Sequence, residues 1–381
     1  MQPLKLAFAG GGLNSVAGYT HFSASRMDHK FQVAAGVFSR KKDVNQQTVD
    51  FWGIQNHYNS LEELIEKEAR HVDAFVVLLP TPDHYQAVSE LLKRNIPVIC
   101  EKPLAYDGDQ IKALKEIYIS GKHFLVTTYN YSGYPLMREL KAMIETGELG
   151  NILHIHLEMP QESFLRPPKT LDYPPGWRKV DKEIPTVCLD LGTHLFHLQK
   201  FLTGKIPRKF VSKMNSFAPY KVIDDVKIIS EFDDEATGYM WFGKTALGNR
   251  NGLRIRIFGS KASAEWFQQD PEKLFINKSN GSLNIIDRGN AERVAMEKRY
   301  NRMFAGHPAG FIEAFANLYR DIAEALTLFK QGNDCSHPYL WTLEDEEKNF
   351  RFFEKAVISH KESRWVEMEE HAERQSIKLY R

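Results

Sequence analysis

Short apolar runs alternate with amphipathic stretches through the first third of the chain. The apolar runs are 3 to 8 residues long and rich in Val, Ile, Leu and Phe, which is typical of strands buried on both faces of a parallel sheet. The stretches between them place apolar residues at helical spacing. This alternation predicts a doubly wound (Rossmann) α/β domain over residues 1–128. We expect its strands at 4–9, 31–38, 74–79, 98–100 and 124–127, and helices at 61–70, 85–94 and 110–120.

The pattern changes after Tyr129. Residues 152–159 alternate between apolar and polar side chains, as a half-buried strand does. Two long helical patterns follow near the end, at 310–329 and 340–360. We therefore expect an α+β domain over 129–381 with a large, mostly antiparallel, open-faced sheet, and a loosely held charged tail at 361–381. Further strands are expected at 211–215, 226–232, 238–242, 253–258 and 264–268.

Composition narrows the classes of protein and of partner. The 50 basic and 49 acidic residues give a net charge of +1, so no overall field favours nucleic acid or an anionic membrane. No apolar run approaches the roughly 20 residues that span a bilayer, and the start of the chain lacks the pattern of a signal peptide. Three cysteines are too few for a disulfide framework or a zinc knuckle. We expect a cytoplasmic protein without a metal site.

A glycine-rich segment joins the first expected strand to a helix. In that context the spacing Gly-x-Gly-x-x-small is typical of a turn that binds a dinucleotide. Gly10 allows the tight turn, Gly12 lets the backbone approach a pyrophosphate, and Ser15 stands where Gly or Ala is usual. The alternative is a glycine-rich turn without a ligand. We expect the dinucleotide to contact Gly10, Gly12, Leu13, Asn14 and Ser15.

The end of the second strand bears on the type of nicotinamide cofactor. NAD sites usually present Asp or Glu there, whereas NADP sites present Arg to the 2′-phosphate. Ser39 and Arg40 occupy this position, and two lysines follow them. A hydroxyl and three cations favour NADP(H) over NAD(H), which is the alternative. The segment could also be a basic turn in solvent.

Two later motifs carry candidate chemistry. Glu101-Lys102-Pro103 closes one buried strand, and Asp190 and His194 follow much later with a spacing of four. Lysine, carboxylate and histidine together can move a proton off a hydroxyl while a hydride leaves the same carbon. The alternatives are a solvated lysine and a surface Asp–His pair.

These segments resemble, in their order along the chain, the glucose–fructose oxidoreductase / inositol dehydrogenase / MocA (Gfo/Idh/MocA) oxidoreductase family. The resemblance covers the glycine turn, Thr81-Pro82-Asp83-His84, the Lys102 motif and Asp190 to His194. It implies that Lys102 hydrogen-bonds the reacting hydroxyl and that a cis Lys102–Pro103 peptide aims the lysine. It also implies that His194 is the general acid/base and that Asp190 orients the sugar or the imidazole.

The resemblance and the strand-end positions suggest further contacts. In the family, the segment after the last Rossmann strand passes the nicotinamide, and aromatic and polar side chains before Asp190 suit a polyol. Each could equally be an ordinary packed or surface residue. We expect cofactor contacts from Thr81, Pro82, His84, Glu101 and Asn130, and substrate contacts from Tyr131, Gln161, Trp177 and Arg178.

The resulting hypothesis is an NAD(P)-dependent oxidoreductase acting on a sugar, a cyclitol or a sugar derivative. By resemblance we expect a homo-oligomer, a dimer or tetramer, formed through the outer face of the second domain's sheet. Two alternatives stay open. One is an NAD-dependent glycoside hydrolase that works by oxidation and elimination, and the other is a dinucleotide-binding regulator without catalysis.

Overall fold

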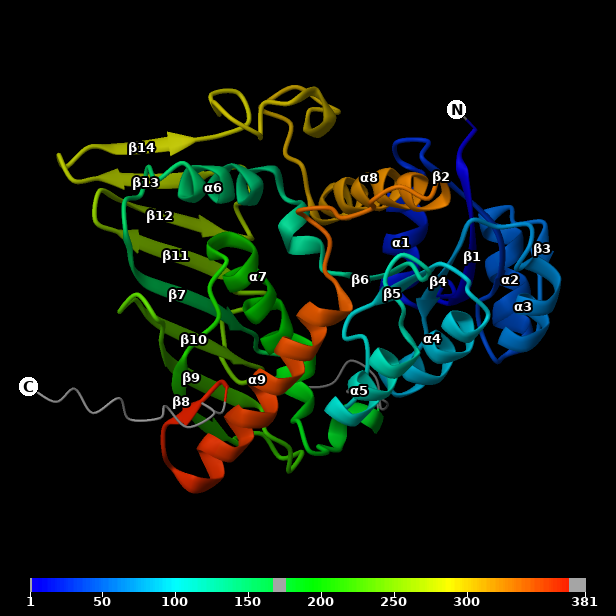
Figure 1. The fold of residues 1–381 in the computed structure, drawn as a ribbon, viewed down its shortest axis with the longest axis horizontal. Coiled ribbons are helices and arrows are strands. Elements are labelled where there is room, and N and C mark those ends of the chain that lie inside the picture. Colours follow the sequence, from blue (N-terminus) through cyan, green and yellow to red (C-terminus); the bar gives the residue numbers. More distant parts are fainter. Residues whose placement is uncertain (1, 167–175, 370–381) are drawn as a thin grey trace, which may run out of the picture.

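The computed structural model describes residues 2–166 and 176–369 and contains two sheets (Figure 1). The first is a six-stranded parallel sheet in the order β3-β2-β1-β4-β5-β6. This order reverses beside β1, so the site for a ligand is the crevice at the carboxyl ends of β1 and β4. The strands are β1 (Leu4–Gly10), β2 (Phe31–Val37), β3 (Asn56–His57), β4 (Ala74–Leu78), β5 (Val98–Glu101) and β6 (Leu125–Thr128).

Helices cross over between these strands, as the apolar pattern predicts. The expected helices at 61–70, 85–94 and 110–120 are confirmed within a few residues. A further helix, α2, follows the second strand and was not predicted, because polar residues dominate it and only one narrow stripe is buried. The helices are α1 (Val16–Arg26), α2 (Lys42–Trp52), α3 (Leu61–Glu68), α4 (His84–Lys93) and α5 (Gly108–Ile117).

The second sheet has nine strands in the order β14-β13-β12-β11-β7-β10-β9-β8-β15. Only the β7–β10 pair is parallel within it, and the other pairs are antiparallel. This confirms the expected large, mostly antiparallel sheet. The strands are β7 (Ile152–Pro160), β8 (Lys209–Asn215), β9 (Asp225–Glu231), β10 (Thr237–Gly243), β11 (Arg254–Gly259), β12 (Ala262–Phe267), β13 (Leu274–Lys278), β14 (Leu283–Ile286) and β15 (Val366–Glu367).

Helices α6, α7 and α9 lie along one face of this sheet, while α8 lies beside α1 at the first sheet (Figure 1). Phe315, Leu318 and Ile322 of α8 belong to the same buried cluster as Phe8 of β1. The chain therefore returns from the second sheet to complete the core of the first. The helices are α6 (Pro135–Glu145), α7 (Thr193–Thr203), α8 (Phe311–Lys330) and α9 (Leu343–Glu362).

The expected loose tail needs a correction. Helix α9 extends to Glu362, and β15 pairs with β8 at the edge of the sheet because buried Val366 packs into the core. Residues 370–381 lie outside the described part of the chain. Strands β13 and β14 were also not predicted, since β13 is only five residues long and β14 is mostly exposed. No helix in residues 2–166 and 176–369 is long and apolar enough to cross a membrane.

Candidate active site

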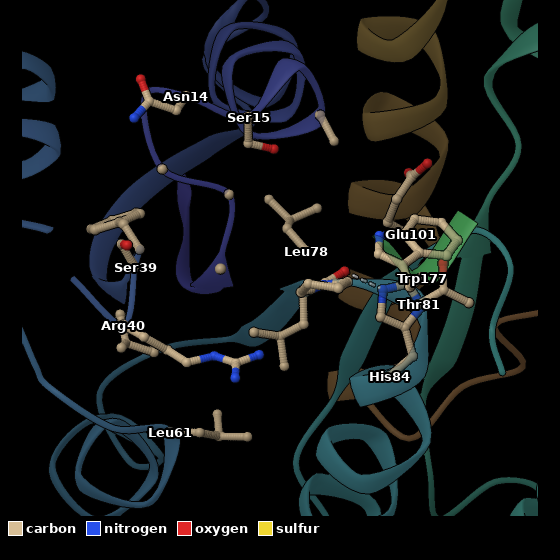
Figure 2. A pocket seen from close by; sticks show the side chains of 18 of the residues that line it. Asn14, Ser15, Ser39, Arg40, Leu61, Leu78, Thr81, His84, Glu101 and Trp177 are labelled. Carbon is tan, nitrogen blue, oxygen red and sulfur yellow. Dashed lines mark hydrogen bonds between the residues drawn. The ribbon is translucent and has the colours of Figure 1, made fainter. Parts of the chain in front are cut away.

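A cavity of about 780 Å³ lies where the carboxyl ends of the first sheet meet the start of α7 (Figure 2). Its walls come from the glycine-rich turn, the ends of β2, β4 and β5, and a π-helical turn at Cys188–Gly192. Thirteen of the predicted site residues line it. They are Gly10, Gly12, Asn14, Ser15, Ser39, Arg40, Thr81, His84, Glu101, Lys102, Trp177, Arg178 and Asp190.

The glycine turn has the geometry that a pyrophosphate needs. Gly10 and Gly11 have φ of +89° and +77°, which side chains rarely tolerate. A Cβ on Gly12 would lie 2.9 Å from the Phe38 carbonyl oxygen. The helix approaches the turn most closely at Gly18, where a Cβ would lie 1.7 Å from the Gly11 carbonyl oxygen. Ser15 instead caps α1 by accepting a hydrogen bond from the amide of Gly18.

The basic segment after β2 lies on the cavity wall but is already engaged. Arg40 donates from Nη2 to Oδ2 of Asp83 over 2.8 Å, and its side chain is 84% exposed. Ser39 accepts a hydrogen bond from the amide of Lys41. Asp83 belongs to the turn before α4, so an acidic group stands beside the arginine that sequence analysis assigned to the 2′-phosphate.

Lys102 reaches from the end of β5 to the second half of the chain. Its Nζ donates to the backbone carbonyl of Asp190 over 2.8 Å and lies 3.4 Å from Oδ1 of the same residue. The Lys102–Pro103 peptide is cis. The two motifs that the sequence separates therefore meet at one point of the cavity wall.

Three cations surround the Asp190 carboxylate. Lys244 Nζ donates to Oδ2 over 2.5 Å, whereas Lys102 and Arg178 approach Oδ1 at 3.4 Å. Burial alone would raise the pKa of Asp190, but the charges of Lys244, Lys102 and Arg178 hold it well below its usual range. Asp190 is thus a carboxylate at neutral pH.

Lys244 was not among the predicted site residues. It follows β10 directly, after buried Phe242 and Gly243, and it is 6% exposed. The only available signal was a lysine immediately after a buried strand, which is too common to single out. Burial lowers the pKa of Lys244, and the Asp190 charge opposes that shift.

His194 lies in the first turn of α7, just behind the cavity wall. Its ring contacts Tyr129 and Tyr131 edge-on, with centroids 5.7 and 4.8 Å away. Among the described residues its Nδ1 has no hydrogen-bond partner. Burial, and then the charge of Lys102, lower the pKa of His194 well below its usual value. The imidazole is therefore neutral at pH 7.

Other predicted residues support the cavity or stand behind it. Tyr131 and Gln161 both bond Asn251, through the Tyr131 hydroxyl at 3.0 Å and the Gln161 amide at 3.1 Å. Asn130 is buried, and its Nδ2 has no partner among the described residues. Among those residues, six predicted contacts do not line the cavity: Leu13, Pro82, Asn130, Tyr131, Gln161 and His194.

Buried His84 and partly buried Glu101 hold the Lys102 turn in place. His84 lies between the carbonyl oxygens of Pro103 and Leu79, each 2.7 Å from a ring nitrogen. Glu101 accepts hydrogen bonds from Thr128 and lies 2.9 Å from Nε2 of His21. Both residues were predicted to contact cofactor. Their side chains are engaged with protein groups at the base of the wall.

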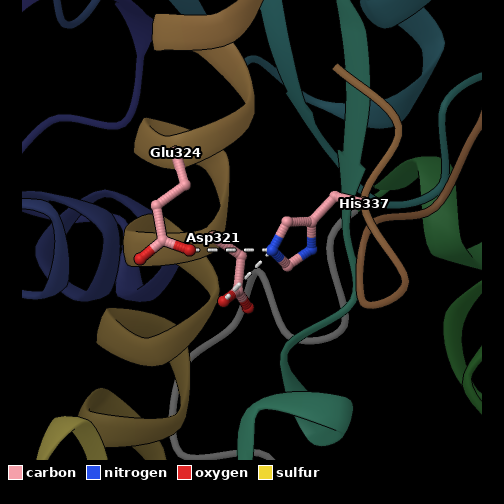
Figure 3. Close-up of side chains that lie close together, drawn as sticks. All are labelled: Asp321, Glu324 and His337. Carbon is pink, nitrogen blue, oxygen red and sulfur yellow. Dashed lines mark ion pairs between the residues drawn. The ribbon is translucent and has the colours of Figure 1, made fainter. Parts of the chain in front are cut away.

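Away from the cavity, Asp321, Glu324 and His337 approach one another closely enough to suggest a metal site (Figure 3). The Asp321 carboxylate, however, already forms ion pairs with Arg138 and Arg299. Two guanidinium groups at one carboxylate leave little attraction for a further cation. We interpret this cluster as a structural link between α6 and α8.

Comparisons with known proteins match both parts of the chain. A family model described as "Oxidoreductase family, NAD-binding Rossmann fold" matches residues 4–129, and "GFO/IDH/MocA C-terminal domain" matches residues 137–265. The uncharacterized oxidoreductase YfiI of Bacillus subtilis is 31% identical over 347 residues, which cover 85% of this chain and 86% of that protein. Glucose-6-phosphate 3-dehydrogenase of Bacillus subtilis is 25% identical over 262 residues, 64% of this chain and 70% of that protein.

The solved structures add the overall shape. An inositol dehydrogenase homolog from Azotobacter vinelandii, complexed with NADH and myo-inositol, superposes with a TM-score of 0.87 and 28% identity. That match covers 96% of this chain and 98% of the other. Both halves of the chain, the Rossmann half and the half with the open sheet, are thus accounted for by one group of proteins. The chain belongs to the Gfo/Idh/MocA oxidoreductase family.

Proposed function

We propose that this protein transfers a hydride between a nicotinamide dinucleotide and a hydroxyl-bearing carbon of a sugar, a cyclitol or a sugar derivative. The observation that carries the proposal is the meeting of Lys102 with Asp190 at the cavity wall, in front of a neutral His194. Relatives named for inositol and for glucose 6-phosphate support the class of substrate. They leave the individual substrate open.

The cavity fits a dinucleotide. The turn at Gly10–Gly12 presents backbone without side chains, and α1 begins directly behind it, which suits a pyrophosphate. Gly10, Gly12, Asn14, Ser15 and Thr81 would hold the cofactor. When bound, the nicotinamide supplies the acceptor for the hydride.

The protein's own residues would handle the proton. Lys102 would donate a hydrogen bond to the reacting hydroxyl, and its charge would stabilise the alkoxide as the O–H bond breaks. His194, which lies just behind the wall, would take the proton on its imidazole through one water and return it when the reaction runs backward. Asp190 would keep Lys102 in place through its backbone carbonyl and stay ionised throughout.

For the cofactor we propose NADP(H), because Arg40 lies at the cavity wall, and NAD(H) is the alternative. An exposed ion pair such as Arg40–Asp83 contributes about 0–1 kcal/mol, so a 2′-phosphate could take the guanidinium from Asp83. The relatives with bound cofactor carry NADH, which favours the alternative. Binding of both dinucleotides therefore has to be measured side by side.

We also propose a homo-oligomer, formed through the face of the nine-stranded sheet that the helices leave uncovered (Figure 1). Ile229, Leu153 and Tyr239 lie on strands of that sheet and are partly or half exposed. Light scattering on the full chain would test this, and a monomer at micromolar concentration would contradict it.

The direct test of function is a panel of sugars, cyclitols and keto sugars with each dinucleotide, followed at 340 nm. Turnover of at least one member supports the proposal. Release of the aglycone from a chromogenic glycoside without net change at 340 nm would indicate the hydrolase instead. Dinucleotide binding without turnover of any member would indicate a regulator.

A further inference from the structure

The cavity wall carries more positive than negative charge. Lys102, Arg178 and Lys244 share one carboxylate, that of Asp190. Among the described residues, none of these three cations pairs with any other acidic side chain. An unbalanced buried charge is unfavourable unless a partner is supplied.

The pairing within this group is unequal. Lys244 forms the short bond, 2.5 Å to Oδ2, and lies behind the wall with 6% exposure. Lys102 and Arg178 face the cavity, and their contacts with Oδ1 are long, 3.4 Å each. Lys244 therefore neutralises Asp190 from behind, and the two cations on the cavity side are left without a close counter-charge.

Nearby acidic residues do not restore the balance. Asp181 accepts hydrogen bonds from the backbone amides of Thr186 and Ile223. Glu162 pairs with Arg166 and bonds the amide of Gly248. Glu101 also lines the cavity, but it is bonded to His21 and Thr128, and counting it still leaves three cations to two carboxylates.

Arg178 is built to receive an anion. Its Cζ lies over the Trp177 ring, 4.8 Å from the centroid, so the aromatic face supports the guanidinium group. Its Nε has no partner among the described residues, and its Nη2 has only the long contact with Asp190. The Nε is buried, but the side chain is 30% exposed and lines the cavity, so an oxyanion there could accept a charge-assisted hydrogen bond from the accessible part of the guanidinium group.

The bound dinucleotide would not supply this counter-charge. Its pyrophosphate belongs at the glycine-rich turn, and Asn14 of that turn lies on the opposite side of the cavity from Trp177 (Figure 2). The oxidised nicotinamide carries a positive charge of its own, so it would add to the imbalance.

We propose that the substrate is an anionic carbohydrate, one that bears a carboxylate or a phosphate which Arg178 binds while Lys102 holds the reacting hydroxyl. This rests on the proposed oxidoreductase function and deepens it. Lys244 acts as a positioning residue, because it neutralises Asp190 and so keeps Arg178 available. A neutral polyol would leave both cavity-side cations uncompensated.

The test compares matched substrates with the full-length protein and the dinucleotide that it binds more tightly. D-Glucuronate, D-gluconate and D-glucose 6-phosphate form the anionic arm, and D-glucose and myo-inositol form the neutral arm. We expect kcat/KM at least about 10-fold higher for a member of the anionic arm, because hydrogen bonds to charged groups are worth that much or more. Preference for the acids or for the phosphate identifies the oxyanion.

Variants connect the preference to Arg178. Arg178→Gln should raise KM for the preferred anion about 10- to 100-fold and raise KM for a neutral sugar by a clearly smaller factor, so that the anion-to-neutral preference falls. Lys244→Met should lower the anion-to-neutral ratio, since Asp190 would then compete for Arg178, and Lys244→Arg should restore it. Arg94→Gln, at an exposed pair with Glu90, is the matched control and should change neither KM.

Equal or better use of neutral sugars, with unchanged ratios in Arg178→Gln, would overturn the anion proposal and leave the oxidoreductase function standing. Absence of turnover with every member would count against the function itself. In that case calorimetric titration of the protein with bound NADH decides the remaining question. Tighter binding of the anionic arm supports the anion site, and equal binding overturns it.

Discussion

Two buried ion clusters in this molecule each place several cations around one aspartate, and they differ in how closely those cations are paired with it. At Asp321, all three guanidinium nitrogens of Arg138 donate hydrogen bonds, to the Ser132 carbonyl, the Tyr300 hydroxyl and the Asp321 carboxylate. At Asp190, two of the three cations make only long contacts with the carboxylate, and both face a cavity. A completed cluster fastens helices together, whereas an incomplete one leaves charge available for a ligand.

Their positions match this difference. The Asp321 cluster joins α6 to α8, and so links the helices of the open sheet with those of the first sheet. The Asp190 cluster joins the end of β5 to the start of α7 at the mouth of the crevice. We infer that the first stabilises the fold and the second serves the reaction.

The largest expected effect is on turnover. Lys102→Met removes the cation that would stabilise the alkoxide, and kcat should fall by about 10²- to 10⁴-fold. Dinucleotide affinity, measured by the fluorescence of bound NADH, should change little because Lys102 lies at the substrate end. A variant with normal kcat would remove Lys102 from the mechanism.

The next effect is on stability. Arg138→Met leaves Asp321 buried with one cation fewer, and the free energy of unfolding should drop by roughly 3–5 kcal/mol. Below the lowered transition temperature, kcat should stay near that of the original protein. Arg138→Lys keeps the charge, so its free energy of unfolding in urea denaturation should lie between those of Arg138→Met and the original protein. A stable Arg138→Met protein with poor turnover would reverse the roles of the clusters.

A third buried carboxylate, Glu346, extends the comparison because no cation within residues 2–166 and 176–369 forms an ion pair with it. It accepts hydrogen bonds from Tyr129 and Asn349, and burial raises its pKa to about 7 from 4.5. The folded state therefore holds a proton that the unfolded state loses, and stability falls as pH rises from about 4.5 through 7. Glu346→Gln should abolish this loss, which amounts to up to roughly 3 kcal/mol. Urea denaturation at pH 5 and pH 8 measures it, and an identical pH dependence in both proteins would contradict it.

The smallest effect concerns an exposed pair. Asp83→Asn frees the Arg40 guanidinium, and affinity for NADPH should rise a few-fold relative to NADH, consistent with the about 0–1 kcal/mol of such pairs. Arg40→Ala should reduce NADPH affinity more than NADH affinity. Calorimetric titration of each variant with NADPH and with NADH measures the two affinities and so gives their ratio. Unchanged ratios in both variants would remove Arg40 from cofactor selection.

Much of this arrangement follows from local patterns in the sequence. Strands buried on both faces are visible in the sequence as apolar runs, so β1, β2 and β4 were predicted nearly to the residue. The glycine turn and the Lys102 motif have fixed chemistry and fixed positions at strand ends. Both could therefore be assigned to one crevice.

What could not be predicted depends on distant packing. Lys244 meets Asp190 only because β10 ends beside the start of α7. Nothing in the sequence distinguishes Gly18 from other glycines, because its role depends on the packing of its helix against the Gly11 carbonyl. The pairing of Arg40 with Asp83 likewise joins two turns that are far apart in sequence. Such contacts are set by the tertiary structure and leave no local pattern.

The most direct test of the account is the free energy of unfolding of Lys102→Met, measured by urea denaturation beside Arg138→Met. If the Asp190 cluster holds surplus positive charge for a ligand, removing Lys102 should leave stability within about 1 kcal/mol of the original protein or increase it. Arg138→Met should lose several times more. A loss of 3 kcal/mol or more in Lys102→Met, similar to that in Arg138→Met, would show that both clusters are structural and would contradict the account.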